Sequence, residues 1–346
     1  MKLYIFLLSL LGFMVSTSDL QAQNKPSSIE EDRLRVMFYN VENLFDPFDD
    51  SLTVDEEFTV DGTRHWTWNK FQDKLSKVYK TIVAVGDLYP PAIIGLCEIE
   101  NRFVLNHLVY QTPFSKFDYR IVHEESPDRR GIDVALLFDP NRFQLLSHEA
   151  IGIQFPFDPD SKTRDVLYVK GLLYGTDTVH LFVNHWPSRY GGQMITDPKR
   201  KYVADRVRQK CDSLHRILSS PSIIIMGDFN DEPWNESIEK HLISSVDIDN
   251  CYLVNLMLYE LKGLLKGSHK YQENWSVLDQ FIVSKSLLST HSNIQVCKDK
   301  ASIFNAVFLL EKDEKYLGLK PYRTFIGFKY HGGFSDHLPI YFDVCK

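Results

Sequence analysis

The sequence of 346 residues lacks an excess of positive charge. It has 46 Asp and Glu residues against 39 Lys and Arg residues, which gives a formal net charge of −7. Broad electrostatic capture of nucleic acid is therefore excluded, because such binding depends on many basic contacts to phosphate groups. A local basic rim is compatible with this balance, and acidic side chains that hold a metal ion have their charge neutralised by it.

The chain also lacks the residue spacings typical of zinc sites. No two histidines are four residues apart, and no two cysteines form a CxxC pair. The five cysteines are Cys97, Cys211, Cys251, Cys297 and Cys345. Their odd number leaves at least one thiol unpaired in a monomer, and their spacing favours no particular disulfide. We expect Cys97, which lies in an apolar run, to be a small core residue.

Long apolar runs are scarce, and the one clear case lies at the N-terminus. Lys2 precedes an apolar stretch over residues 3–15, and small and polar residues follow up to Ala22. This pattern predicts a signal peptide over residues 1–22, and hence a secreted or periplasmic protein; an uncleaved anchor is the alternative. The stretch is too short for a comfortable membrane span. Residues 23–32 are predicted to be a linker.

Residues 33–346 are predicted to form one domain with many strands and few helices. No period of 20–50 residues repeats, so a solenoid is excluded. Helices are expected at Trp68–Val85 and Asp197–Leu218. Apolar or alternating runs predict strands at Leu34–Tyr39, Ala92–Cys97, Asp133–Phe138, Val166–Tyr174, Thr178–Val183, Ser222–Met226, Leu278–Val283 and Ile340–Phe342. The hairpins among them favour mixed sheets over a doubly wound parallel sheet.

Polar side chains recur where these strands begin or end. They are Asn40, Glu42, Glu98, His185, Asp228, Asn230, Asp279, Asp336 and His337. Each alone would be an ordinary loop residue or cap, but so many in one context indicate a single site on rigid strand ends. Carboxylates with Asn suit Mg²⁺, with Mn²⁺ or Ca²⁺ as alternatives. Histidines beside such an ion can take a proton from water or bind a phosphoryl oxygen.

Seven short segments, in this order, resemble the endonuclease/exonuclease/phosphatase family. They are residues 39–46, 97–101, 131–136, 184–189, 227–231, 278–283 and 335–339. The resemblance spans nearly the whole chain after the signal segment. It implies a two-sheet, four-layer α/β sandwich of the deoxyribonuclease I-like type, with mixed sheets and outer helices.

The resemblance also implies a role for each strand-end residue. Glu98 and Asp336 match metal-binding acids, with Asn40 and Glu42 nearby. His185 matches a histidine that bonds the scissile phosphate, while Asp228 and Asn230 match the pair that positions the nucleophile or leaving group. Asp279 matches the acid that orients His337, which acts as a base or phosphate ligand. Whether Asp228 or His337 activates water is left open.

Several positions keep two interpretations. Asp133 either orients His185 or is a surface residue. Arg130 and Arg189 are candidate substrate contacts, together with Arg64, although Arg189 is equally a solvated loop residue. A tyrosine of some DNA-repair relatives falls near Phe182, which lacks the hydroxyl. Trp66 and Trp68 either stack a base or pack in the core, and the apolar residues of 304–310 either contact lipid or are buried.

These features predict a secreted, divalent-metal-dependent phosphodiesterase, most simply an endonuclease. Nucleic acid is the expected substrate, bound weakly because basic residues are few. The alternatives are a lipid or inositol phosphate phosphoesterase on the same scaffold, and a catalytically inactive binding protein. The sequence indicates no stable protein partner, and a monomer is expected.

Overall fold

The computed structural model describes residues 33–87, 89–243, 252–259, 267–297 and 300–346. The expected signal peptide and linker, residues 1–32, lie outside the described residues. Contacts within Arg33–Lys346 form one compact unit. In the described part of the chain, no helix is both long and apolar enough to cross a membrane.

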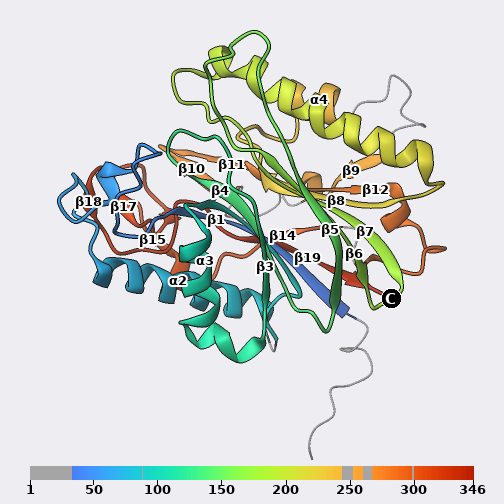
Figure 1. Cartoon of the computed structure of the whole chain (residues 1–346), viewed down its shortest axis with the longest axis horizontal. Helices are drawn as coiled ribbons and strands as arrows, with labels where there is room; N and C mark the ends of the chain where they lie inside the picture. The colour runs from blue at the N-terminus through green and yellow to red at the C-terminus, as the bar shows by residue number, and fades with distance from the viewer. Residues whose placement is uncertain (1–32, 88, 244–251, 260–266, 298–299) are drawn as a thin grey trace, which may run out of the picture. The chain divides into compact units, whose positions relative to one another are not determined.

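Two main sheets run through this unit (Figure 1). The first contains, in spatial order, β13 (Gln295–Val296), β19 (Ile340–Cys345), β1 (Arg33–Leu44), β2 (Ile93–Ile99), β4 (Asp133–Phe138) and β3 (Arg120–His123), with β14 (Ser302–Ile303) beside β19. The second contains β5 (Phe143–Ile151), β6 (Val166–Leu173), β7 (Asp177–His185), β8 (Ser222–Asp228), β12 (Asp279–Ser284) and β9 (Leu253–Asn255).

Each sheet has one parallel pair of strands at its centre, flanked by antiparallel neighbours. The parallel pairs are β1 with β2 and β7 with β8. β19 runs antiparallel to β1, and β12 runs antiparallel to β8. The C-terminal ends of the parallel strands therefore lie beside the N-terminal starts of β19 and β12, which places the polar strand-end residues together.

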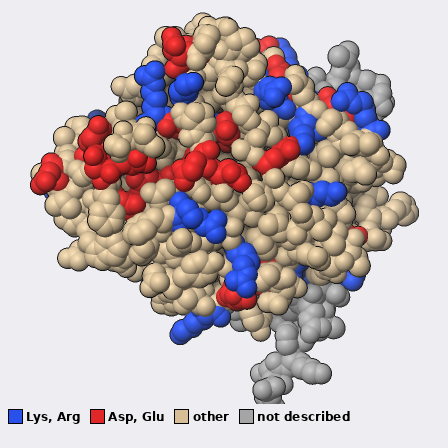
Figure 2. Space-filling view, in the orientation of Figure 1, with Lys and Arg blue, Asp and Glu red and all other residues tan. Residues whose placement is uncertain are grey.

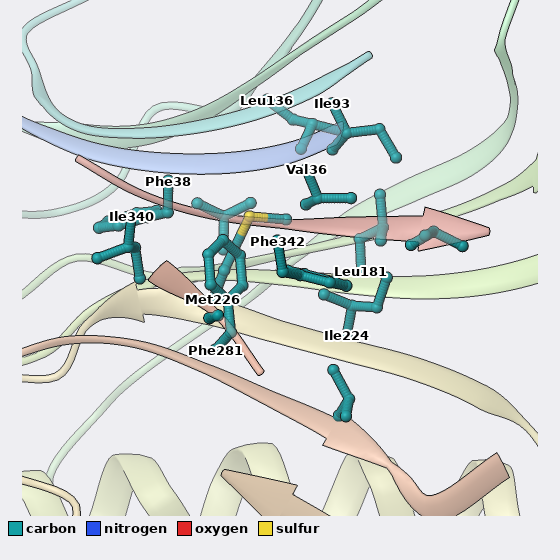
Figure 3. Close-up of a cluster of buried hydrophobic side chains, with 14 of the residues drawn as sticks. Val36, Phe38, Ile93, Leu136, Leu181, Ile224, Met226, Phe281, Ile340 and Phe342 are labelled. Atoms are coloured by element: carbon teal, nitrogen blue, oxygen red, sulfur yellow. The ribbon is translucent and has the colours of Figure 1, made fainter. Parts of the chain in front are cut away.

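Alternation along the strands divides the core into three layers. On β1, Val36 and Phe38 face the second sheet, whereas Met37 and Tyr39 face the outer helices. The inter-sheet layer interdigitates side chains from both sheets, as Figure 3 shows for Val36, Phe38, Ile93 and Leu136 on one side and Leu181, Ile224, Met226 and Phe281 on the other. This apolar contact holds the two sheets, and the strand ends they carry, in fixed relation.

Helices cover the outer face of each sheet. α2 (Trp68–Gly86) and α3 (Arg102–Tyr110) pack on the first sheet, and α4 (Gln193–Ile217) packs on the second. The predicted four-layer sandwich is therefore confirmed.

The smaller elements are β10 (His269–Tyr271), β11 (Asn274–Ser276), β15 (Leu310–Lys312), β16 (Leu319–Pro321), β17 (Phe325–Ile326), β18 (Lys329–Tyr330), η1 (Glu56–Phe58), η2 (Pro113–Phe117), η3 (Ser237–Leu242), η5 (Leu256–Tyr259), η6 (Lys285–Leu288) and η7 (Val307–Leu309).

Two helix predictions need correction. α4 begins four residues before the predicted Asp197, because its first turn carries exposed Met194 and Ile195 and so shows no buried apolar face. α3 was not predicted at all. It is a short helix, capped by the Asn101 side chain, which accepts a hydrogen bond from the Val104 amide.

A disulfide joins Cys297 to Cys345, across 48 residues of sequence, and the cysteines among the described residues that stay free are Cys97 and Cys211, both buried. Cross-linking a loop of that length restricts the unfolded chain, so we expect Cys345→Ser to lower the free energy of unfolding by ~4 kcal/mol. Urea denaturation of both proteins without reductant measures this. Dithiothreitol should destabilise the wild type by the same amount and leave the variant unchanged; a wild type indifferent to reduction would contradict the expectation.

Candidate active site

Irregular strand ends aim Asn40 and Glu98 at the space between the two sheets. Register shifts interrupt the pairing of β1 and β2 just after Asn40, and of β2 and β4 around Glu98. Such bulges re-aim side chains at the end of a strand. Glu98 and Asn230 have positive φ angles of 61° and 50°, as do Glu42 and Asn43 at 51° and 54°. Non-glycine residues rarely adopt this conformation, and clusters of them are typical of functional sites.

The Asp228 carboxylate, at the end of β8, lies at the centre of the site. Its Oδ2 accepts a hydrogen bond from Asn40 Nδ2 at 3.0 Å. The same oxygen lies 3.8 Å from His185 Nε2 and 3.7 Å from His337 Nε2. Its Oδ1 accepts from the Asn230 amide at 2.9 Å. Two imidazoles from different parts of the chain therefore face one carboxylate oxygen, at distances slightly longer than a direct hydrogen bond.

Asp279 fixes the orientation of His337. Asp279 Oδ2 lies 2.7 Å from His337 Nδ1, and it also accepts from Ser268 Oγ at 2.5 Å. Burial opposes a charge on His337, but Asp279 and Asp228 outweigh it and raise the pKa of His337 well above its ordinary value. His337 is therefore a cation at neutral pH, with Nδ1 bound to Asp279 and Nε2 turned toward Asp228.

His185 has the opposite protonation state. Burial, followed by the charges of Arg164, Arg130 and His337, lowers the pKa of His185 well below its ordinary value. Its ring is thus neutral, and within the described residues its buried Nδ1 has no hydrogen-bond partner. The site pairs one neutral and one cationic histidine, an arrangement suited to general acid–base chemistry.

Both interpretations of Asp133 are wrong: it does not orient His185, and it is buried rather than on the surface. Asp133 Oδ2 lies 3.1 Å from His123 Nε2, and its Oδ1 accepts from the amide and the hydroxyl of Ser126. Both oxygens are therefore engaged by the β3–β4 connection. The sequence alone did not reveal this, because His123 lies in a short strand without a clear apolar pattern.

Glu98 and Asp336 are the partly accessible carboxylates of the predicted metal set. The Glu98 side chain is 15% exposed, accepting from Asn40 Nδ2 at 3.2 Å and from the Asn43 amide at 2.8 Å. The Asp336 side chain is 22% exposed and lies 2.9 Å from Arg323 Nη2. Oxygen ligands with open faces fit a hard divalent cation, so the residues present are compatible with the predicted Mg²⁺.

Glu42 is placed differently from the other predicted ligands. Its side chain is buried, with Oε1 3.3 Å from Arg323 and Oε2 accepting from the Thr324 amide at 2.6 Å. Burial, followed by repulsion from Asp336, raises the pKa of Glu42 to about 7. Both oxygens are thus engaged by protein groups, and its role as a metal ligand stays a prediction.

The balance of charge also fits a divalent cation. Five carboxylates meet here, those of Glu42, Glu98, Asp228, Asp279 and Asp336, together with three cationic groups, those of Lys74, Arg323 and His337. When all are ionised, two negative charges remain. One divalent ion would cancel this excess, which burial makes costly, as the raised pKa of Glu42 indicates.

The predicted substrate-binding arginines differ in how exposed they are and in how firmly acidic side chains bind them. Arg130 is half exposed and lies close enough to His185 to lower the pKa of His185; among the described residues, its side chain forms an ion pair with Asp128 alone, at 3.8 Å. Arg189 instead holds the Asn230 loop, donating to Asn230 O at 2.7 Å and lying 3.3 Å from Asp231. Arg64 pairs with Glu57 and lies over the Phe58 ring. Of these three, Arg130 is best placed to meet a phosphate.

Burial settles most of the remaining open positions, but not that of Trp68. Phe182 and Trp66 are buried, and Trp66 Nε1 donates to Phe45 O at 2.8 Å, so neither is available for a substrate. Trp68 is partly exposed within an aromatic group that includes Phe48 and Phe103. Residues 304–310 form no continuous lipid-facing patch, because Leu309 is buried while Val307 is exposed.

Several residues of the site carry no recognisable signal in the sequence. Lys74 is buried and donates to Phe334 O at 2.6 Å, just before Ser335–His337. Arg164 fixes the backbone of His185 by donating to the His185 carbonyl oxygen at 3.2 Å. His269 lies against His337, with ring centroids 4.7 Å apart. Arg323 joins Glu42 to Asp336.

The pKa of Asp228 predicts an acidic limit to activity. Burial, followed by the charge of Asp279, raises the pKa of Asp228 to about 6, although His337 opposes this. Protonation would remove the acceptor shared by Asn40 and the histidines. We expect kcat/KM to rise with pH through about 6, to stay level near neutral pH, and to fall again in an alkaline limb where His337 loses its proton. A profile measured with bis(p-nitrophenyl) phosphate tests this, with circular dichroism to show that the fold persists at pH 5; constant kcat/KM from pH 5 to 8 would contradict it.

The fold and sequence are similar to those of known phosphoesterases. The model of the Endonuclease/Exonuclease/phosphatase family matches residues 35–346. A mannosyl-6-phosphatase from Bacteroides thetaiotaomicron superposes with a TM-score of 0.56 at 14% identity, covering 90% of this chain and 100% of its own. The D. rerio TDP2 complexed with single strand DNA product gives 0.52 at 14% identity, covering 91% and 99%.

The human Nocturnin catalytic domain with bound sulfate anion gives a TM-score of 0.52 at 19% identity, covering 90% of this chain and 94% of its own. No curated protein matches the sequence. Because the family match spans nearly all described residues, it covers both sheets and every strand-end residue discussed above. The chain belongs to the endonuclease/exonuclease/phosphatase family of phosphoesterases.

Proposed function

We propose that this chain is a divalent-metal-dependent phosphodiesterase that hydrolyses nucleic-acid phosphodiester bonds. The observation that carries the proposal is the meeting of His185 Nε2 and His337 Nε2 at Asp228 Oδ2. Asp228 is a suitable group to orient a water molecule, and cationic His337 is a suitable donor to a phosphoryl oxygen. Neutral His185 can bind a second phosphoryl oxygen through Nε2–H.

Glu98 and Asp336 would hold the metal ion, with Asn40 keeping Glu98 in place. When bound, a divalent cation supplies charge neutralisation at the phosphoryl group. Two further side chains position the reacting groups. Asn230 Nδ2 donates to Trp186 O at 3.0 Å and so fixes the loop beside Asp228. Asp279 holds the His337 ring in place.

The charge of the surroundings favours a diester over a monoester. Three of the four arginines nearest the site have close carboxylate partners, Arg130 being the exception: Arg323 with Asp336, Arg164 with Asp128, and Arg189 with Asp231. A phosphate monoester carries up to two negative charges, as a phosphorylated side chain does at neutral pH, and would need free cations. A diester carries one. Paired arginines therefore support a diester substrate.

Nucleic acid is the substrate class that these features support best. The TDP2 neighbour is complexed with single strand DNA product, which shows that this fold accommodates a nucleic-acid strand in a relative. In this chain Arg130 offers one half-exposed cation beside His185. Few basic contacts predict weak binding and little sequence preference. We further propose that the enzyme acts as a monomer.

A substrate panel tests the proposal. Purified protein is incubated with Mg²⁺ or EDTA and with bis(p-nitrophenyl) phosphate, p-nitrophenyl phosphate, plasmid DNA, RNA, sphingomyelin, inositol phosphates and mannose 6-phosphate. We expect EDTA-sensitive hydrolysis of the diester and of nucleic acid, and little hydrolysis of the monoesters. Protein carrying His337→Ala, purified in parallel, controls for contaminating nucleases. Hydrolysis of lipid or monoester alone would overturn the nuclease assignment.

We also propose that the protein is exported, on the basis of the N-terminal apolar segment described above. Cleavage after about Ala22 is expected. Intact-mass measurement of protein recovered from an exporting host tests this, and a chain that still starts at Met1 would contradict it.

A further inference from the structure

We infer that an open depression between α4 and the loop of residues 152–162 is a second binding subsite, for a nucleotide of a single-stranded substrate away from the scissile bond. This inference rests on the proposed nucleic-acid substrate. The depression has a volume of about 710 Å³ and is lined by Phe155, Pro156, Pro159, Lys162, Tyr202 and Arg206. That volume is in the range of small-molecule sites.

The depression offers two cations without carboxylate partners. Within the described part of the chain, neither Lys162 nor Arg206 forms an ion pair with an acidic side chain. Arg206 Nη1 donates to Gln209 Oε1 at 3.1 Å, while its buried Nε has no hydrogen-bond partner among the described residues. A guanidinium N–H held away from water without an acceptor is costly unless a ligand supplies one. A phosphate oxygen is the acceptor that suits a guanidinium best.

A neighbouring lysine, Lys199, differs from these two cations because it has an acidic partner. Lys199 lies close to Phe155, but its Nζ is occupied by Asp158 at 2.7 Å and by Ser161 Oγ at 2.9 Å. It serves to hold the loop against α4. The cations that remain for a ligand are therefore Lys162 on the loop and Arg206 on the helix. Figure 2 shows Lys and Arg side chains over the upper part of the molecule, where α4 lies, above a band of acidic side chains.

Aromatic rings lie beside these cations. Phe155, Phe157 and Tyr202 form a group with ring centroids 5.6 to 6.1 Å apart. Phe157, which lies beside the depression rather than in its lining, is 55% exposed and Tyr202 is partly exposed, whereas Phe155 is buried in contact with both. Rings beside cations are the combination that binds single strands, because bases stack on the rings while the cations meet the backbone. A free phosphate or a bare anionic surface would not explain the rings.

The loop connects the depression to the catalytic histidine. Arg164, two residues after Lys162, donates to His185 O at 3.2 Å and to Trp186 O at 2.6 Å. Two residues span at most about 7 Å of Cα distance, so Lys162 lies close to the segment that carries His185. Arg129, next to Arg130, donates to Asp160 O at 3.2 Å and clamps the same loop. The depression and the catalytic histidine are therefore linked through one loop, as a substrate strand that extends beyond the scissile bond requires.

The test compares Lys162→Ala/Arg206→Ala with Lys116→Ala/Arg216→Ala, a control that removes the same two charges from exposed positions elsewhere. Binding of a cleavage-resistant phosphorothioate 12-mer is measured by fluorescence anisotropy in Mg²⁺ at several salt concentrations. We expect Kd to rise about tenfold in the first variant, since charge contacts and stacking act together there. The slope of log K against log salt should fall by about 1.4, at about 0.7 for each lost phosphate contact. Hydrolysis of bis(p-nitrophenyl) phosphate should be unchanged.

A second variant tests the stacking. Tyr202→Leu should weaken binding of the 12-mer but not of an abasic 12-mer with the same backbone. Equal losses in the control pair, unchanged binding in the test pair, or reduced hydrolysis of the small diester would each overturn the inference. The inference would also be overturned if the Lys162→Ala/Arg206→Ala variant lost binding to phosphatidylserine vesicles but still bound the oligonucleotide like the wild type. Binding of the 12-mer is measured without turnover. If the wild type bound the 12-mer through this depression but hydrolysed no diester, the proposed function would be refuted and the subsite would stand.

Discussion

Glu98→Gln should lower kcat by about 10³-fold or more, because a ligated cation contributes several kcal/mol to stabilising the transition-state charge. Glu98 is one of the two partly accessible carboxylates in the predicted metal set, and it is held from two sides, by Asn40 Nδ2 and the Asn43 amide. Gln keeps the shape but removes the charge. The variant should therefore fold normally, bind Mg²⁺ more weakly in isothermal titration calorimetry, and regain little activity at saturating metal.

Glu100→Gln is the matched control. Glu100 lies two residues along the same segment, and its Oε2 accepts from the Asp46 amide at 2.6 Å. Burial, with repulsion from Asp46 and Asp55, raises the pKa of Glu100 to about 9, so this side chain is already neutral at pH 7. Gln mimics that state, and activity should hardly change. Wild-type turnover by Glu98→Gln, or an equal loss in both variants, would remove Glu98 as the metal carboxylate.

His337→Ala should lower kcat by roughly 10²–10⁴-fold, the usual scale for losing a positioned proton-transfer or charge-stabilising group. Asp279→Asn should have a milder effect, about 10–10²-fold, because His337 stays present but loses its orientation. It should also lower the pKa of His337, since Asp279 is among the charges that raise it. The alkaline limb of the pH profile should therefore move to lower pH in Asp279→Asn.

The pair His331 and Glu311 provides the control for this prediction. His331 Nε2 lies 2.7 Å from Glu311 Oε2, the same kind of contact as that between His337 and Asp279 but on partly exposed side chains outside the strand-end cluster. Glu311→Gln and His331→Ala should leave kcat within a few-fold of the wild type. If Asp279→Asn shifted neither kcat nor the alkaline limb while His337→Ala was inactive, the proposed pairing would be wrong.

The layered fold was predictable because its signals are local. The alternation in Leu34–Tyr39 and the apolar run before Asp228 each specify a strand from a few neighbouring residues. Motif order then brought Glu98, His185, Asp228 and His337 into one predicted site, and the structure does place them together. Asp279 beside His337 follows from the pairing of Asp279 with Asp228 on adjacent strands.

The supporting residues were not predictable, because their partners are distant in sequence. Arg323 reaches Glu42 across 281 positions, and no pattern around Arg323 distinguishes it from a surface arginine. The Cys297–Cys345 disulfide likewise depends on β13 and β19 being neighbours, which only the folded sheet reveals. Asp133 was misjudged for a different reason: His123 is only 10 residues away in sequence, but the two side chains meet only once β3 pairs with β4.

The single amide of Asn40 joins the two sheets at the catalytic end. Its Nδ2 donates to Glu98 on its own sheet and to Asp228 on the other. Neither sheet carries a working set of groups by itself, so turnover reports on the docking of the two sheets rather than on the formation of either one. During refolding, activity should appear after far-ultraviolet ellipticity has recovered. On gentle denaturation activity should be lost first, once the two sheets shift by about an ångström relative to each other while the strands within each sheet remain paired.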